Sequence, residues 1–598
     1  MKAKLYPAPR SIRYQRGIFD GTRRDIVKLD AAITGEVLDA VRRAIGEWHP
    51  GLALTHGKAE PASTLLTISY SRGGHPESYR LTCSSDGINL TAGTPQGFWY
   101  GIMTLRQLSD QCGRRIPHVD IRDEPDFANR GVMLDISRCK VPSQETLMQM
   151  IDGFARLKFN QLQLYTEHTF AFTGHSLVWA DSSPLTGADI LALQAYCRDR
   201  FIELVPNLNS FGHFERWLRY PEYHAFAECP DGFTHPFSGQ PIEFGSTLKP
   251  DKKSLSLLRD LYDEYLPLFT SSEFNIGGDE PWELGKGASR ARCEKEGTTN
   301  VYIDFLSQIQ QEVEKRGRHM MFWSDIVLRE PASLSRLSRN LTALNWGYEG
   351  NHPFNKECTQ VAGAGLPFYV CPGTSSWNSL VGRTSNMERN LANASKAGLA
   401  NGAIGYLVTD WGDHGHHQYL PVSYPGFVMA GCHAWNAKGA RAADAADGVD
   451  RIFAQDEKIG TLITDMGRVL ELAPSKIRNE TIFNRLLFWQ MEHEPSAVAG
   501  IDDGQLADCD EAFIELDGRL ATLPSGSLVA DELANAIRLA RHGIHRLQYF
   551  RGTRKDRRHL REELSVAIGE HERLWLARNR SGGLSESAGH LRQSLTAL

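Results

Sequence analysis

The sequence predicts an α/β protein: a (β/α)8 barrel with an N-terminal α+β domain and a C-terminal all-helical domain. Three observations lead to this fold class. The chain has 598 residues, which is too long for one ordinary domain. Between residues 127 and 440, short apolar runs alternate with amphipathic helical segments, as in a barrel of parallel strands. Beyond residue 440 only helical patterns continue. We therefore expect domains at residues 1–126, 127–440 and 441–598.

The N-terminal domain combines strand-like and helical patterns. Residues 65–70 (LLTISY) and 79–83 (YRLTC) alternate apolar and polar side chains, which is typical of half-buried strands. Residues 97–108 (GFWYGIMTLRQL) predict a helix that packs on these strands. Pro117 and the acidic segment DEPDF at 123–127 indicate a linker to the next domain.

Eight apolar runs in the middle domain predict the barrel strands. They lie at residues 131–136, 161–165, 202–207, 273–277, 320–323, 342–346, 368–371 and 402–408. Helices are predicted between them at residues 144–157, 188–200, 253–269, 301–316 and 387–398. The rival fold, a doubly wound open sheet, would normally carry a glycine-rich phosphate turn after its first strand, and none is visible. The segment LGKGAS at 284–289 lacks the earlier glycine of a phosphate-binding loop.

The C-terminal domain shows a clear helical periodicity. Residues 533–547 repeat apolar side chains at steps of three and four: Leu533, Ile537, Ala540, Ile544 and Leu547. These side chains share one helix face, which we expect to be core.

Composition and charge narrow the class of protein. Hydrophobic residues make up 41% and charged residues 23%, as in ordinary soluble proteins, and the net charge of −6 does not suit a dedicated nucleic-acid binder. The first residues lack the apolar core of a signal peptide, and no stretch reaches the ~18 apolar residues of a membrane span. The ten cysteines contain no C-x-x-C pair and are expected to be reduced. We expect a cytoplasmic protein that binds neither nucleic acid nor membrane.

Acidic, amide and indole side chains collect where the predicted strands end. The carboxyl ends of barrel strands carry the active site in enzymes of this fold. Besides Asp279 and Glu280, the side chains found there are Glu167, Asn209, His213, Trp323, Trp346, Trp377, Trp411 and Asp413. Carboxylates and amides bind hydroxyl groups, and indoles stack on the apolar faces of sugar rings. The sequence therefore predicts a carbohydrate site.

The adjacent pair Asp279-Glu280 is the sharpest local feature. Neighbouring residues on a regular strand point to opposite faces, but after Gly277-Gly278 both can turn into the site. An ordinary retaining glycosidase places its two carboxyl groups opposite each other at ~5 Å, which adjacent residues do not suit. They suit substrate assistance, in which the sugar's own 2-acetamido oxygen attacks the anomeric carbon. The alternative is a purely structural role, in which the two acidic residues lie in the first turn of a helix that begins before Pro281.

Two other patterns could indicate chemistry. The segment DHGHH at 413–417 offers zinc ligands, but its spacing matches no zinc motif, and we favour polar residues that line the sugar site. Ser324-Asp325 has no histidine partner at a recognisable spacing, so a catalytic triad is not expected. We predict neither a metal nor a cofactor.

Three segments resemble glycoside hydrolase family 20, the β-N-acetylhexosaminidases. Residues 77–108 resemble the family's small N-terminal domain, RGVMLDISR at 130–138 its first barrel strand, and FNIGGDE at 274–280 its catalytic signature. The resemblance runs from about residue 77 to 426, and the helical C-terminal region resembles one bacterial subgroup. It implies an exo-acting enzyme that removes terminal GlcNAc or GalNAc from a glycan or oligosaccharide with retention.

The resemblance also implies roles for single residues. Glu280 would be the general acid/base and Asp279 the carboxylate that orients the acetamide. Arg130 would bind hydroxyls of the non-reducing sugar, and Asp413 would bind its outer hydroxyls. The indoles that wall the acetamide pocket would be Trp323, Trp346 and Trp411.

Several positions depart from the family's pattern. Asn275 stands where a histidine is usual, and a carboxylate–histidine pair has become Asn209 with His213. Glu167 replaces an Asp-Asp type of segment. The tyrosine that bonds the acetamide oxygen has no obvious counterpart, and Trp377 or Asn378 stands near its place.

Two other functions stay open from the sequence. One is a sugar-binding barrel that has lost catalysis. The other is an ordinary two-carboxylate glycosidase that pairs Glu280 with Glu167 or Asp413. A homodimer is also open, because the helical domain could cover its own barrel or a neighbour's.

Overall fold

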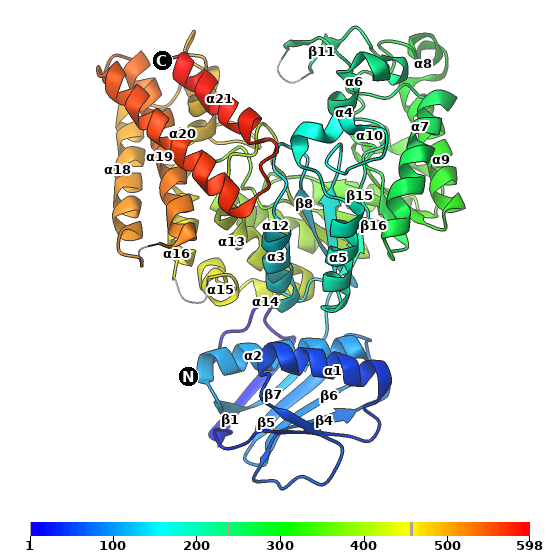
Figure 1. Cartoon of the computed structure of the whole chain (residues 1–598), viewed down its shortest axis with the longest axis vertical. Helices are drawn as coiled ribbons and strands as arrows, with labels where there is room; N and C mark the ends of the chain where they lie inside the picture. Colours follow the sequence, from blue (N-terminus) through cyan, green and yellow to red (C-terminus); the bar gives the residue numbers. More distant parts are fainter. Residues whose placement is uncertain (1, 237–238, 455–457, 525) are drawn as a thin grey trace.

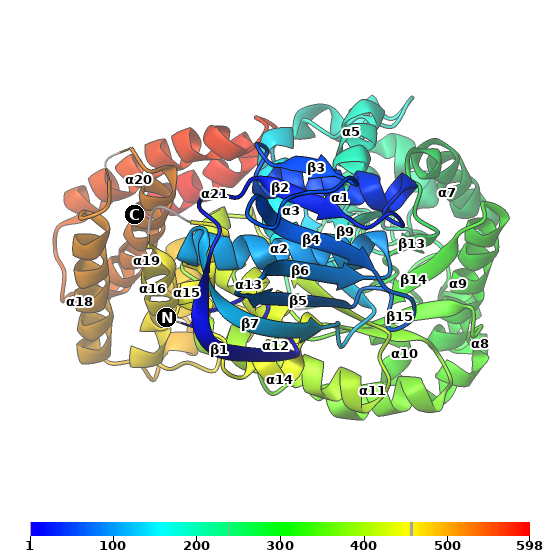
Figure 2. The ribbon, with the colours of Figure 1, turned by 90° about the horizontal axis from the view of Figure 1, so that it is seen from below.

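The computed structural model describes residues 2–236, 239–454, 458–524 and 526–598 of the chain. Figure 1 shows three regions: an α/β region at the bottom, a barrel above it, and a helical region beside the barrel. Seen from below in Figure 2, the N-terminal sheet lies across the barrel while the C-terminal helices stay at its side. The predicted fold class is confirmed.

The N-terminal region is a seven-stranded mixed sheet with two helices. Its strand order is β1-β7-β5-β6-β4-β2-β3. The strands are β1 (Ser11–Asp20), β2 (Ile26–Leu29), β3 (Ala53–Thr55), β4 (Thr64–Tyr70), β5 (Tyr79–Ser84), β6 (Gly87–Ala92) and β7 (Arg115–Asp123). Helices α1 (Gly35–Trp48) and α2 (Pro95–Cys112) lie on the side of the sheet that faces the barrel (Figure 1).

The predicted linker at Pro117 is wrong, because this proline lies inside β7. It pairs with Ile18 beside an irregularity in the β1–β7 register, and the ladder from β7 to β5 begins only at Val119. A proline has no N–H to donate, so it is tolerated where the ladder is interrupted.

Eight parallel strands form the barrel, in the order β10-β9-β8-β17-β16-β15-β14-β13. They are β8 (Asn129–Asp135), β9 (Gln161–Tyr165), β10 (Glu203–Val205), β13 (Glu273–Asn275), β14 (His319–Trp323), β15 (Leu341–Trp346), β16 (Phe368–Cys371) and β17 (Gly405–Asp410). A bridge between Asn207 and Asn275 joins the first and last strands of this order. Each strand coincides with one of the eight predicted apolar runs.

Helices cover the outside of the barrel. The five predicted helices correspond to α3 (Gln144–Arg156), α5 (Gly187–Arg198), α7 (Lys252–Tyr265), α9 (Thr298–Lys315) and α12 (Thr384–Ala400). Further helices in the barrel region are α4 (Ser176–Trp179), α6 (Glu215–Leu218), α8 (Arg290–Glu296), α10 (Asp325–Arg329), α11 (Phe354–Gly363), α13 (Tyr424–Trp435) and α14 (Ala437–Ala440). The short strands β11 (Phe233–Thr234) and β12 (Pro241–Ile242) form a separate pair.

Successive side chains along a barrel strand point alternately into two hydrophobic cores, one around the barrel and one inside it. Along β8, Val132 and Leu134 belong to the large core around the barrel, whereas Met133 belongs to a small core inside it. The inner core also contains Trp323, Trp377 and Trp411, with Trp346 packed against it. The indoles therefore lie at the carboxyl ends of the strands, away from the N-terminal region.

The C-terminal region is helical in its described residues. Its helices are α15 (Ala445–Ile452), α16 (Gly460–Met466), α17 (Ile482–Phe488), α18 (Asp503–Leu520), α19 (Leu528–Phe550), α20 (Arg557–Arg578) and α21 (Leu584–Thr596). The predicted apolar face of α19 is buried, with Leu533 and Leu547 fully inaccessible. Within the described chain, no helix combines the length and apolar character that a membrane span requires.

The turn between α20 and α21 is bonded to the rim of the barrel. Backbone N–H groups of Ser143 and Arg580 donate to Arg578 and Val141 at 2.8 and 2.9 Å. A Cβ added to Gly582 or Gly583 would collide with the backbone of the loops that carry Ser182 and Cys139. Only glycine allows these two backbones to approach so closely.

Candidate active site

Asp279 and Glu280 follow β13 at a sharp bend. Gly277 and Gly278 have φ of 68° and 84°, in the left-handed region that glycine adopts most easily. The Asn275 carboxamide accepts a hydrogen bond from the Gly277 N–H at 3.0 Å and holds the bend. Asn275, which stands where the family usually has a histidine, therefore supports the turn that carries both carboxylates.

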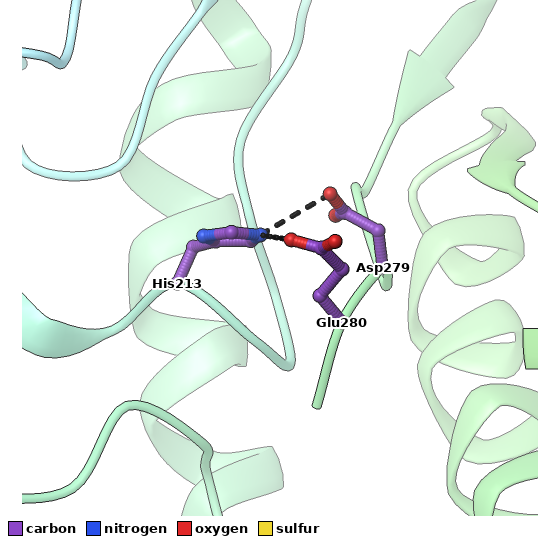
Figure 3. A group of neighbouring side chains, drawn as sticks. All are labelled: His213, Asp279 and Glu280. Carbon is purple, nitrogen blue, oxygen red and sulfur yellow. Dashed lines mark ion pairs between the residues drawn. The ribbon is translucent and has the colours of Figure 1, made fainter. Parts of the chain in front are cut away.

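Both carboxylates turn toward one imidazole (Figure 3). His213 Nε2 lies 3.2 Å from Asp279 Oδ2 and 3.5 Å from Glu280 Oε2. Burial disfavours the charged imidazole, but the two carboxylates outweigh it and hold the pKa of His213 well above its usual range. The alternative of a helix N-terminus at Pro281 is wrong, because the next helix, α8, begins only at Arg290.

An arginine that was not predicted as a site residue follows the carboxyl end of β8. Arg138 lies 3.1 Å from the Glu167 carboxylate and 3.3 Å from that of Asp135, and its guanidinium lies over the Trp411 ring at 5.2 Å. Asp135 also accepts a hydrogen bond from Gly412 N at 2.9 Å, which ties the loops after β8 and β17 together.

Arg130 as a sugar-binding residue is wrong. It lies at the amino end of β8, is 1% exposed, and its guanidinium donates to both carboxylate oxygens of Glu77 at 2.7 and 3.0 Å. It joins the N-terminal region to the bottom of the barrel. Both arginines belong to RGVMLDISR, and only Arg138 follows the carboxyl end of the strand, where a barrel site lies.

Glu167 and Asn209 are linked by a buried tyrosine. Tyr165 donates to Glu167 Oε1 at 2.9 Å and accepts from Asn209 Nδ2 at 2.5 Å. Asn209 is 1% exposed, so its amide positions Tyr165 in this structure. Burial raises the pKa of Glu167 to about 7, although Arg138 and His213 oppose the shift.

Three of the four predicted tryptophans contact a tyrosine that was not predicted. Tyr348 stacks on Trp346 with centroids 5.2 Å apart and meets Trp377 edge-on at 5.0 Å. Its hydroxyl accepts a hydrogen bond from Trp411 Nε1 at 2.7 Å, and Trp411 lies 6.1 Å from Trp323. Tyr348 stands two residues after Trp346, just beyond the end of β15. Its place near a strand end was the only feature of the sequence that could have indicated a site residue.

Asp413 and the histidines after it take different directions. Asp413 accepts from Asn378 Nδ2 at 3.2 Å, and burial raises its pKa although Arg138 opposes the shift. His417 turns away and contacts the Ser587 carbonyl at 3.0 Å. In the described chain, the histidine and acidic side chains close enough to share a metal ion are His213, Asp279 and Glu280, which excludes the DHGHH segment.

Asp325 is a further carboxyl group near the catalytic pair that the sequence analysis did not select. It follows Trp323 at the end of β14. Burial, together with the negative charges of Asp279 and Glu280, raises its pKa to about 8.

Comparison with known proteins agrees with this arrangement. Residues 127–377 match the model of the glycosyl hydrolase family 20 catalytic domain, and residues 2–124 match that family's domain 2. Such a barrel, with paired carboxylates and an indole cluster at its carboxyl end, defines a glycoside hydrolase by class. The chain belongs to glycoside hydrolase family 20.

The similar proteins carry related names. A β-hexosaminidase of Akkermansia muciniphila is 27% identical over 304 residues, which cover 46% of this chain and 61% of the relative. One of Porphyromonas gingivalis is 27% identical over 285 residues, covering 42% of this chain and 36% of the relative. The chain thus spans about half the length of these curated relatives.

Solved structures share the fold. The Flavobacterium johnsoniae chitobiase has a TM-score of 0.60 at 18% identity and covers 94% of this chain and 96% of its own. A Vibrio harveyi family 20 exo-β-N-acetylglucosaminidase has a TM-score of 0.60 at 16% identity and covers 77% of both chains.

Proposed function

We propose that the protein is an exo-β-N-acetylhexosaminidase that removes terminal β-linked GlcNAc or GalNAc from a glycan with retention. The observation that carries this proposal is the adjacent pair Asp279-Glu280, turned toward one charged histidine beside a cluster of four indoles. Two carboxylates on neighbouring residues suit a reaction in which the substrate supplies the nucleophile. The names of the curated relatives support the same substrate class.

In the first step the 2-acetamido oxygen attacks the anomeric carbon while Glu280 protonates the leaving oxygen. In the second step Glu280 takes a proton from water, which opens the cyclic intermediate with overall retention. Asp279 Oδ2 faces His213, whereas Oδ1 is buried without a hydrogen-bond partner among the described residues. Oδ1 is therefore free to accept the acetamide N–H and to balance the positive charge that develops there.

The rest of the site would hold the sugar. Trp323, Trp346 and Trp411 would confine the acetamide, with the Tyr348 hydroxyl beside them for its oxygen. Arg138 takes the hydroxyl-binding role that the resemblance gave to Arg130, together with Asp413. Glu167, paired with Arg138 and Tyr165, would set the position of that arginine.

A substrate comparison tests the mechanism. Purified protein is offered an aryl β-N-acetylglucosaminide and the matching aryl β-glucoside, which lacks the acetamide. We expect turnover of the first and none of the second, with the β-anomer as first product by NMR. Equal cleavage of the glucoside would instead favour an ordinary glycosidase that pairs Glu280 with Glu167 or Asp413. Saturable GlcNAc binding without hydrolysis would favour a sugar-binding protein.

A cytoplasmic location and a homodimer stay predictions. Cell fractionation and sedimentation of the purified protein test them.

A further inference from the structure

A polar cleft lies where the rim of the barrel meets the C-terminal helices. Its volume is about 640 Å³. One wall comes from barrel loops and includes His168, Arg216 and Arg219, and the other includes Ser585 at the start of α21. We call it the rim cleft. Ligand sites often measure roughly 300–1,000 Å³ and favour domain interfaces.

Three loops contribute to both the catalytic residues and the rim cleft. In the first loop Arg138 lies with the catalytic residues, and its neighbour Cys139 lines the rim cleft. In the second loop Glu167 lies with the catalytic residues, and its neighbour His168 lines the cleft. His213 contacts the catalytic carboxylates, while Arg216, three residues later, lines the cleft. Successive Cα atoms are ~3.8 Å apart, so the cleft lies within reach of a short oligosaccharide held at the catalytic site.

The cleft contains polar groups that lack partners. His168 is 5% exposed, and its Nδ1 has no hydrogen-bond partner among the described residues. Arg219 Nε has none there either. Burial and the charges of Arg216 and Arg219 hold the pKa of His168 well below its usual range, so its ring is neutral. Buried polar atoms without partners are costly, and a bound ligand would satisfy them.

The charges of the cleft balance. Its arginines are matched by Asp181, Glu572 and Glu586, and Arg216 pairs with Glu586 at 2.6 Å. A free anion would meet no net positive charge. Serine hydroxyls, a neutral imidazole, a guanidinium and the first turn of α21, which has no side-chain cap, offer both donors and acceptors. Sugar hydroxyls need this mixture, because each both donates and accepts.

We propose that the rim cleft binds a further sugar residue of the glycan whose terminal residue occupies the catalytic site. The proposal rests on the proposed function, since it assigns part of that enzyme's substrate. The wall formed by α20 and α21 lies beyond residue 377, where the match to the catalytic-domain model ends. The second sugar site would thus be a property of the helical C-terminal region.

Calorimetry with the catalytic site blocked tests the proposal. The full-length protein is saturated with a thiazoline analogue of the cyclic intermediate and then titrated with chitotetraose. We expect saturable binding, weakened at least tenfold by Arg219→Ala. Arg558→Ala is the matched control, because Arg558 is 89% exposed on α20 and does not line the cleft. No binding to the blocked protein, or equal binding by Arg219→Ala, would overturn the proposal.

A crystal soaked with both ligands gives a second reading. Sugar density between Arg219 and Ser585 supports the proposal, and density elsewhere, or a phosphate ion that displaces chitotetraose from the cleft, contradicts it. If Arg219→Ala does not fold, Ser585→Gln narrows the cleft from the other wall. Failure of thiazoline to bind the wild-type protein would contradict the proposed function, whereas thiazoline binding without chitotetraose binding contradicts the rim cleft alone.

Discussion

Replacing Tyr348 by phenylalanine should weaken binding of a thiazoline inhibitor while leaving the fold intact. The ring contacts with Trp346 and Trp377 survive, because only the hydroxyl is lost. The Tyr348 hydroxyl accepts from Trp411 Nε1 at 2.7 Å, which leaves its own proton to donate to the inhibitor atom that takes the place of the acetamide oxygen. Phenylalanine leaves that buried atom of the inhibitor without a partner in the complex. An unsatisfied buried polar group costs about 1–3 kcal/mol, which corresponds to about 5- to 150-fold in affinity.

Competitive inhibition of aryl β-N-acetylglucosaminide hydrolysis measures this effect. Tyr369→Phe is the matched control, because Tyr369 is 2% exposed and its hydroxyl donates to Gln161 at 3.3 Å near the amino end of the barrel. Both variants lose one buried hydroxyl, and we expect only Tyr348→Phe to raise the inhibition constant. A change below twofold, or an equal change in the control, would refute the assignment of Tyr348 to the acetamide pocket.

Three other results follow from the structure. Glu280→Gln should lose at least about 100-fold in kcat, because the leaving oxygen loses its acid; undiminished turnover in a folded protein would contradict the role. Arg138→Ala should raise KM, whereas Arg130→Ala should leave KM unchanged and lower the free energy of unfolding by about 3–5 kcal/mol, as measured by denaturant titration. Although burial opposes the shift, Arg216 lowers the pKa of Glu586 to about 2. This ion pair therefore stabilises the fold above the ordinary glutamate pKa and is lost as the pH falls toward 2, so Glu586→Gln should flatten the decline of Tm between about pH 5 and 2.

The barrel could be predicted because its strands are buried on both faces. Such strands are continuous apolar runs, and each of the eight observed strands coincides with one. The bend at Gly277-Gly278 could also be predicted, because two glycines at a strand end permit backbone angles that other residues resist. The sequence therefore indicated that both carboxylates turn into one site.

The residues that prediction missed depend on register or on distant contacts. Choosing Arg130 over Arg138 ignored which end of β8 each arginine occupies. Tyr348 lies beyond the end of β15, and its neighbours come from separate strands. The ion pair of Arg216 with Glu586 joins residues 370 positions apart. No periodicity within one segment can indicate such a pair.

The contact of α21 with the loop after β17 bears on how this protein can be shortened. Ser587 donates to the Gly415 carbonyl at 2.6 Å, and its own carbonyl contacts His417 at 3.0 Å. A chain ending at residue 440 would retain every residue that the family models match. It would lose both contacts of Ser587 with the loop that carries Asp413. A shortened protein that keeps the proposed activity would then need α21 as well as the barrel. A gene fragment chosen from the family match alone would encode an incomplete sugar site.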